Sequence, residues 1–141
     1  INMAKDEMRF KAFLSFLISE GTYITYVPMA KSKEKKRGFN QAECIAKEIG
    51  KIVKKEVLPL LQKIKDTPSQ TELDKEQRLK NVKDSFVPAG LLTLKVNKQV
   101  PTRMVLVDDI WTTGATLKEC CRVLKKAGVE KVWGFTLART V

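Results

Sequence analysis

Two adjacent carboxylates followed by hydroxyl side chains and a glycine are the residues of this sequence whose types and spacing best suit chemistry. Asp108 and Asp109 come directly after the apolar run 104–107. The polar segment that follows contains Thr112, Thr113, Gly114, Ala115 and Thr116. An apolar, β-prone run of this length predicts a buried strand, so we expect both acids where that strand ends.

The residues after this segment predict a helix with one apolar face. That face is formed by Leu117, Cys120, Cys121 and Leu124. Gly128 is expected to end the helix. The first amides of a helix have no partner within the helix, and the helix dipole adds positive potential there. Gly114 lets the backbone approach a ligand, and threonine hydroxyls can donate further bonds to phosphate oxygens. We therefore predict that residues 112–116 bind a phosphate group.

The position of the acids constrains what carries that phosphate. Asp108 and Asp109 would repel a phosphate if they faced it, whereas they suit the vicinal hydroxyls of a sugar or a hydrated divalent cation. The chemistry predicted is therefore recognition of a phosphorylated sugar. The alternative is a buried strand followed by a helix that Asp and Thr side chains cap, with no ligand. The whole pattern is more specific than an isolated Asp-Asp pair, which favours the phosphate site.

This run of apolar residues, two aspartates and Thr-Thr-Gly-Ala-Thr resembles the phosphoribosyl pyrophosphate (PRPP) motif of type I phosphoribosyltransferases. The resemblance implies that residues 112–116 hold the 5′-phosphate and that Asp108 and Asp109 lie beside the ribose hydroxyls, with Mg²⁺ held indirectly through water. It also implies an α/β fold with a central, mostly parallel twisted sheet flanked by helices, and a flexible loop or β-ribbon flap. Trp111 is bulkier than the aliphatic residue expected there; it stacks on a base or partner, or packs beside the loop, and we favour packing.

The rest of the sequence predicts the elements that position these residues, in one domain over 1–141. We expect one helix over 3–19 and another from Asn40 to Val53. The first helix lies within the N-terminal stretch 1–20, and Gly21 ends it. Strands are expected over 22–27, over 57–64 (broken by Pro59) and over 131–137, and a short β-ribbon or edge strand is expected over 87–100. We also expect a basic loop over 31–38 and a partly helical segment over 67–81.

The basic loop carries a second resemblance. Arg37-Gly-Phe-Asn-Gln-Ala-Glu43, after a strand that ends in Val-Pro, resembles the ComF branch, the competence-associated phosphoribosyltransferase-like proteins. The loop after this strand meets the pyrophosphate in type I phosphoribosyltransferases. By that resemblance Lys36 and Arg37 are candidate pyrophosphate ligands, with Lys31 and Lys33 behind them. A patch that faces DNA, or a merely solvated patch, remains an equal alternative.

The segment 67–81 carries the third resemblance. It matches ComF proteins at Gln70, Thr71, Leu73, Arg78 and Asn81. In the wider family the equivalent region is a flexible loop that closes over the diphosphate. Arg78 is the candidate catalytic residue of this segment because a guanidinium forks onto phosphate oxygens. The alternative is an arginine on a solvated helix near Glu72 and Asp74.

Composition limits the classes of function. The chain has no histidine, which excludes Ser-His-Asp triads and histidine-ligated metal sites. Its three cysteines form no Cys-x-x-Cys pair and predict a reducing, cytoplasmic environment. ComF proteins usually carry an N-terminal cysteine-rich zinc module, and this sequence contains none. No apolar run is long enough to insert into a membrane. The net charge of +11 favours anionic partners.

Two hypotheses of different class follow. In the first, the domain binds PRPP and Mg²⁺ and transfers the phosphoribosyl group with loss of pyrophosphate, and the ComF resemblance implies a role in natural competence and DNA uptake. In the second, the protein is a non-catalytic competence protein that keeps the phosphate and ribose site but binds single-stranded DNA. Basic loops near Phe39 and Trp111 would then contact the strand by phosphate attraction and base stacking. The two hypotheses are compatible.

Overall fold

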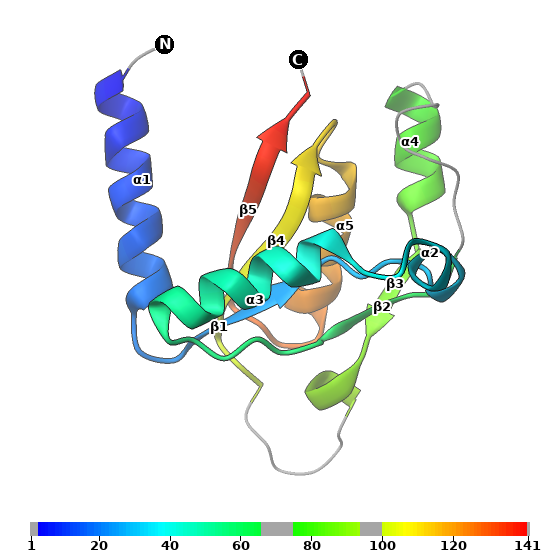
Figure 1. The fold of residues 1–141 in the computed structure, drawn as a ribbon, viewed down its shortest axis with the longest axis horizontal. Coiled ribbons are helices and arrows are strands. Elements are labelled where there is room, and N and C mark those ends of the chain that lie inside the picture. Colours follow the sequence, from blue (N-terminus) through cyan, green and yellow to red (C-terminus); the bar gives the residue numbers. More distant parts are fainter. Residues whose placement is uncertain (1–2, 66–74, 94–99, 141) are drawn as a thin grey trace.

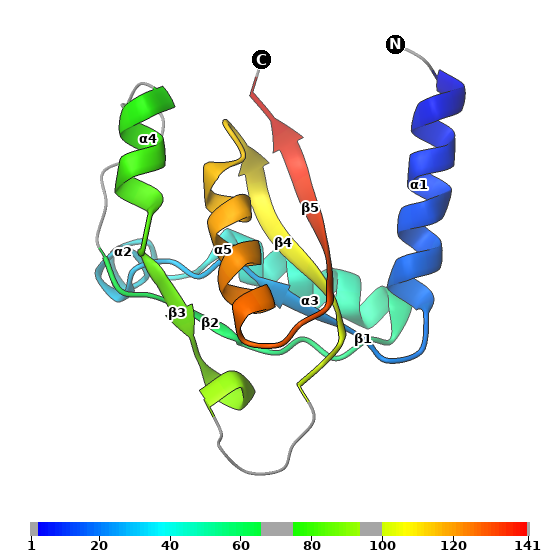
Figure 2. The ribbon, with the colours of Figure 1, turned by 180° about the vertical axis from the view of Figure 1, so that it is seen from behind.

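A three-stranded parallel sheet forms the centre of the computed structural model, which describes residues 3–65, 75–93 and 100–140 (Figure 1). The strand order is β1-β4-β5, and the strands are β1 (Thr22–Tyr26), β4 (Arg103–Trp111) and β5 (Lys131–Arg139). Helix α3 (Gln41–Val53) crosses one face of the sheet, and α5 (Ala115–Lys126) covers the other, as the view from behind shows (Figure 2). The expected α/β architecture with a parallel sheet is confirmed.

The run 104–107 is continuously apolar because it lies in the middle strand, β4. Met104, Val105, Leu106 and Val107 are all buried because helices cover both faces of the sheet. Side chains alternate along a strand, so Met104 and Leu106 join the core cluster under α5, while Val105 and Val107 join the cluster under α3. The central strand therefore fixes both helices, and the polar residues at its carboxyl end are held by a rigid layer.

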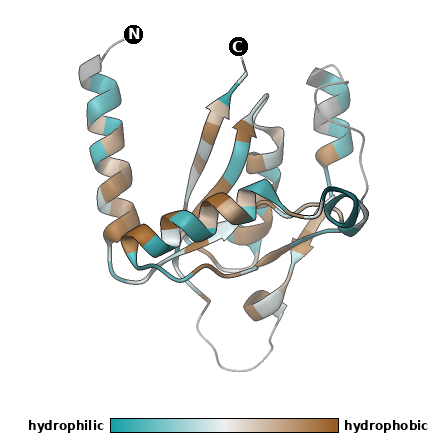
Figure 3. Ribbon diagram, viewed as in Figure 1, coloured by the Kyte–Doolittle hydropathy of each residue, from teal (hydrophilic) through white to brown (hydrophobic). Residues whose placement is uncertain are grey.

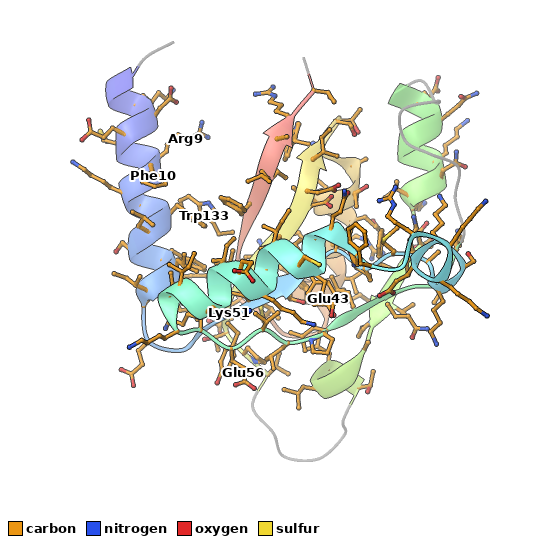
Figure 4. All side chains as sticks on the ribbon, viewed as in Figure 1. Arg9, Phe10, Glu43, Lys51, Glu56 and Trp133 are labelled. Atoms are coloured by element: carbon orange, nitrogen blue, oxygen red, sulfur yellow. The ribbon has the colours of Figure 1, made fainter. Side chains whose placement is uncertain are left out.

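Helix α1 (Met3–Ile18) packs its second half against the same sheet, which confirms the expected N-terminal helix. Trp133 of β5 lies between the strand and this helix (Figure 4). Its ring centroid is 5.7 Å from that of Phe13 and 5.8 Å from that of Phe16. Among the described residues, no helix combines the length and the apolar character that a bilayer crossing needs.

The basic segment expected to be a loop is a helix, α2 (Lys31–Arg37), so this prediction was wrong. Lysine, arginine and glutamate are good helix formers, and no residue of this run breaks a helix. Gly38 ends the helix because its φ of 90° is left-handed and its amide donates to the Glu34 carbonyl at 2.7 Å. Figure 3 shows this helix as hydrophilic along its length, and it has no buried residue.

The second sheet also differs from expectation. Of the strand predicted over 57–64, only β2 (Leu61–Lys63) forms, because Pro59 has no amide to donate; Val57 makes a single parallel bridge to Ile24. The expected ribbon over 87–100 was also wrong in part. Its first residues belong to β3 (Phe86–Pro88), which pairs antiparallel with β2, and a 3₁₀ helix, η2 (Gly90–Thr93), follows.

The polar segment over 67–81 is helical at its end, as expected. Helix α4 (Lys75–Val82) precedes β3, and the residues expected to form the mobile part, 67–71, lie outside the described ranges. The single-domain prediction over 1–141 stays a prediction for the same reason.

Candidate functional site

The two acids lie within β4 and not beyond it. The ladder between β4 and β5 pairs Asp108 with Thr136 and continues to Trp111 opposite Arg139, so the expectation that the strand ends at Val107 was wrong. Ile110 and Trp111 are β-prone residues, and the neighbouring strand extends far enough to pair with them. Asp108 and Asp109 are therefore held by the rigid end of a central strand, both partly buried.

A cleft of about 400 Å³ opens over these acids at the carboxyl ends of β1 and β4. Parallel α/β sheets place their ligands at such ends. Val27, Pro28, Met29 and Ala30 come from the segment after β1, Lys33 and Arg37 from α2, and Asn40 and Gln41 from the start of α3. Lys63 comes from β2, Asp108, Asp109 and Ile110 from the end of β4, and Thr112 and Thr116 from the turn and the first residues of α5. The cleft thus joins carboxylates, hydroxyls and cations from six parts of the chain.

Asn40 fixes the rim of this cleft. It is buried, its side-chain amide donates to the Val27 carbonyl at 3.1 Å, and its side-chain oxygen accepts from the Ala42 amide at 3.0 Å. The second bond is an N-cap, so the predicted Asn40-capped helix is confirmed. One side chain therefore ties the end of β1 to the start of α3, and the cations of α2 are carried on a short, anchored connection.

Burial sets the charge of Asp108. Burial first, and then the neighbouring Asp109 carboxyl, raise the pKa of Asp108 from its ordinary 3.8 to about 8, against the opposing effects of the Asp109 amide and Lys63. The Asp109 amide donates to Asp108 Oδ1 at 2.9 Å. Within the described ranges neither acid belongs to a salt bridge. The pair therefore carries less negative charge at neutral pH than two ionised carboxylates, which reduces the repulsion of an incoming phosphate.

We expect this raised pKa to appear as a pH dependence of stability. Because the folded-state pKa of Asp108 lies above its unfolded value, the folded protein binds a proton between about pH 4 and pH 8 that the unfolded chain releases, so stability falls as pH rises through this window. Urea unfolding without divalent cations at pH 5 and pH 8 measures the fall. Asp108→Asn is expected to flatten it; an equal fall in both proteins would contradict the assignment.

The segment 112–116 forms the turn between β4 and α5. Gly114 adopts a left-handed φ of 80° as the N-cap of α5, and no side chain caps the helix from that position. The Ala115 amide instead donates to Thr113 Oγ1 at 3.3 Å. The Trp111 carbonyl accepts from both the amide and the hydroxyl of Thr140, at 2.9 and 3.2 Å, so the start of the turn is fixed to the end of β5.

Trp111 packs against the turn and the core cluster under α5, so the preference for packing over stacking on a base is confirmed. Its ring carbon Cζ2 lies 2.5 Å from the place where a Cβ on Gly114 would stand. A glycine is therefore required here both for its left-handed φ and for the room that the indole takes. The space enclosed by the turn is small, about 10 Å³, and it shares Asp108, Ile110, Thr112 and Thr116 with the larger cleft.

Of the ten predicted site residues, five line the cleft, three lie in the turn beside it (Thr113, Gly114 and Ala115), and the other two are Lys36 and Arg78. Asp108, Asp109, Thr112, Thr116 and Arg37 all line the cleft. Lys36 does not; α2 presents Lys33 and Arg37, one helical turn apart, on the cleft side. Arg78 lies in α4, but its side chain falls outside the described residues.

Lys63 is a cleft residue that sequence reasoning missed. It comes from β2, lies with its Nζ 5.9 Å from the Phe86 ring centroid, and acts on the charge of Asp108. Its strand is short and pairs with a segment more than 20 residues later, so the local pattern gave no sign of the cleft. The only available signal was its place four residues before the segment 67–81, whose equivalent in the wider family is a closing loop.

The donor set at the cleft fits a Mg²⁺ ion held mainly by its ligand. The described residues contain no group of three or more acidic, cysteine or histidine side chains that could enclose a metal. Mg²⁺ keeps several waters and is commonly bound by one or two carboxylates together with substrate phosphates. Asp108 and Asp109 supply those two carboxylates, so the predicted indirect contact through water is compatible with this site.

Comparison with known proteins adds independent information. A family model described as the phosphoribosyl transferase domain matches residues 35–139. Competence protein F of Haemophilus influenzae is 32% identical over 80% of this chain and 48% of its own length. Competence protein ComFC of Streptococcus pneumoniae is 32% identical over 92% of this chain and 56% of its own length. The DNA utilization protein YhgH of Escherichia coli is 29% identical over 84% and 49%. The chain thus spans about half the length of these relatives. No solved structure matches it significantly.

Proposed function

Because the chain belongs to the phosphoribosyl transferase domain family, with ComF-like competence proteins among its relatives, we propose that it binds PRPP in the cleft between β1 and β4 and transfers the phosphoribosyl group. The observation that carries this proposal is the shared lining of one cleft. Two acids that suit a sugar, two hydroxyls of the turn that suit a phosphate, and three cations (Lys33, Arg37 and Lys63) all face it.

The residues divide the ligand between them. The turn over 112–116 offers backbone amides, glycine and hydroxyls to the 5′-phosphate, where the dipole of α5 adds positive potential. Asp108 and Asp109 accept hydrogen bonds from the ribose hydroxyls, and a protonated Asp108 can also donate one. Arg37 and Lys63, from two different elements, neutralise the diphosphate. Arg78 remains a proposed ligand of the leaving group, on a helix beside the undescribed segment 66–74.

In the transfer itself, the bond from ribose C1 to the pyrophosphate oxygen breaks, a bond from C1 to the acceptor nucleophile forms, and the acceptor releases a proton. Negative charge grows on the departing pyrophosphate, so fixed cations beside it lower the barrier. A bound Mg²⁺ supplies further neutralisation of that diphosphate. Holding the sugar at its hydroxyls and its phosphate keeps C1 in line with its two partners, which is the larger part of what this site offers.

Titration calorimetry with PRPP and Mg²⁺ tests the proposal directly. We expect heat in the presence of Mg²⁺ and much less heat with a chelator. The absence of heat in the wild-type protein would contradict the proposal, and the effect of Asp109→Asn, argued in the Discussion, then locates the binding.

Binding of single-stranded DNA is a second candidate function, and one observation favours it. Helix α2 carries five cations in seven residues with none of its residues buried, and Phe39, just beyond it, is 48% exposed and available to stack on a base. Trp111 gives this hypothesis less support, because it is partly buried and packs against the core cluster under α5. We expect affinity for an oligothymidylate to fall steeply between low and physiological salt. Affinity that is unchanged by salt would remove this function.

Both proposed functions are compatible with the processes for which the relatives are named. Two relatives are named competence proteins and a third a DNA utilization protein, so we propose a role in DNA uptake or use for this chain, in partnership with the competence machinery. The described cysteines are all free thiols, which supports placing the protein in the reducing cytoplasm.

A further inference from the structure

The phosphate-binding turn is the narrowest part of the site. The space it encloses is about 10 Å³, whereas the adjoining cleft has about 400 Å³. Roughly 10–15 Å³ of such space holds a single water molecule, so a phosphate with its several oxygens needs several times more. Thr112 and Thr116 also face the larger cleft, but a phosphate enclosed by the turn itself needs more space than the turn offers in this structure.

The side chain that takes up this space is Trp111. It lines the small space in the turn but not the larger cleft. Its ring atoms Cζ2 and Cη2 lie 2.5 and 2.6 Å from the position of a Cβ on Gly114, so the indole packs directly against the glycine whose backbone would approach the ligand. The backbone of Trp111 is fixed by two bonds from Thr140, so the ring can leave only by rotating about its side-chain bonds.

A second group in the turn already has a hydrogen-bond partner within the protein. The Ala115 amide, one of the first amides of α5, is already satisfied by Thr113 Oγ1 at 3.3 Å. A phosphate that enters the turn would take over this amide, and Thr113 could then donate its hydroxyl proton to the phosphate instead. This exchange is small beside the movement of an indole ring, so Trp111 is the main obstacle.

We propose that Trp111 determines how tightly this site binds the phosphoryl group of a sugar phosphate: the indole lies in the turn beside Gly114 and must swing aside before the turn can enclose the phosphate. The proposal rests on the proposed PRPP site and adds that this arrangement of the indole must open first. When only a fraction of the protein is competent to bind, the apparent affinity falls by that fraction. A smaller side chain at position 111 removes this penalty.

The first test compares wild-type protein with Trp111→Leu in calorimetric titrations with ribose 5-phosphate and with ribose. Leucine restores an aliphatic side chain and leaves the turn open. We expect the variant to bind ribose 5-phosphate about tenfold more tightly or better, and to bind ribose no differently from the wild type. Because a general structural defect would weaken both ligands, the difference between them reports on the phosphate alone.

The second test follows the ring itself and does not depend on that variant. The sequence contains two tryptophans, so Trp133→Phe, which keeps an aromatic ring between β5 and α1, leaves Trp111 as the only indole. We expect its fluorescence to shift to longer wavelength when ribose 5-phosphate saturates the protein, because the ring moves toward water, and to stay unchanged with ribose.

The outcomes separate this inference from the function on which it rests. Equal binding of ribose 5-phosphate by wild type and Trp111→Leu, with constant fluorescence, would overturn the role of Trp111 and leave the phosphate site in place. Absence of binding by both proteins would overturn the phosphate site and the role of Trp111 together. Weaker binding by Trp111→Leu would show that the indole holds the phosphate, which is the opposite of the proposal.

Discussion

Replacement of Asp109 by asparagine is expected to weaken the binding of PRPP with Mg²⁺ by roughly 10- to 100-fold, because hydrogen bonds to a charged group contribute about 1.5–3 kcal/mol. Asp109 is partly buried at the end of a rigid strand and lines the cleft, so no other carboxylate can take its place without moving β4. Asparagine keeps the size of the side chain but loses the charge and one acceptor. The measurement is the dissociation constant from calorimetry, with Mg²⁺ at saturation.

Asp84→Asn is the matched control. Asp84 is exposed, lies 3.6 Å from Arg122 on the outer side of α5, and is not part of the cleft. It has a left-handed φ of 57°, which asparagine also tolerates, so this exchange is expected to leave both fold and binding intact. If Asp109→Asn binds PRPP as the wild type does while remaining folded, the acids do not hold the sugar.

Replacement of Gly114 by alanine is expected to lower the free energy of unfolding by roughly 2–5 kcal/mol, the sum of left-handed strain of about 1–2 kcal/mol and overpacking of about 1–3 kcal/mol. The strain follows from the φ of 80°, and the overpacking follows from the 2.5 Å approach of the Trp111 ring to the new Cβ. Urea unfolding measures the loss. Phosphate binding is expected to be lost as well, since the turn cannot keep its shape.

Gly38→Ala separates the two causes. Gly38 has a left-handed φ of 90° but nothing within 4 Å of an added Cβ, so alanine there carries the strain alone. We expect it to lose about 1–2 kcal/mol, clearly less than Gly114→Ala. Combining Gly114→Ala with Trp111→Leu removes the overlap and is expected to recover the difference, which a double-mutant cycle quantifies. Equal losses at the two glycines would mean that the indole does not press on the turn.

The centre of the site was predictable from local sequence because its elements are defined by short-range patterns. The apolar run 104–107 is a strand that is buried on both faces, and the helical period from Leu117 onward places α5 correctly. Asn40 was predictable for the same reason, as an N-cap depends on the residues next to it. These local signals were sufficient to place the acids and the turn next to each other, where the chain passes from β4 to α5.

The errors have two different causes. Whether the basic run 31–38 is helix or loop depends on a local balance between good helix formers and like-charge repulsion, which a charge pattern alone does not decide. The length of β4 depends on how far β5 continues beside it, and the place of Lys63 depends on a distant pairing with Phe86. These last two features are fixed by contacts between residues far apart in the chain, so the residues next to them in the sequence do not predict them.

The two bonds from Thr140 to the Trp111 carbonyl have a consequence for how the protein is made. The turn over 112–116 is synthesised some 25 residues before Thr140, whose two bonds hold its start in place. Strand β5, which carries the chain to Thr140, follows α5 and can pair with β4 only after this crossover has formed. Such non-local closure is slow compared with helix formation. A nascent chain would therefore form α3 and α5 around β4 first, and it would complete the turn over 112–116 only in the last step of folding.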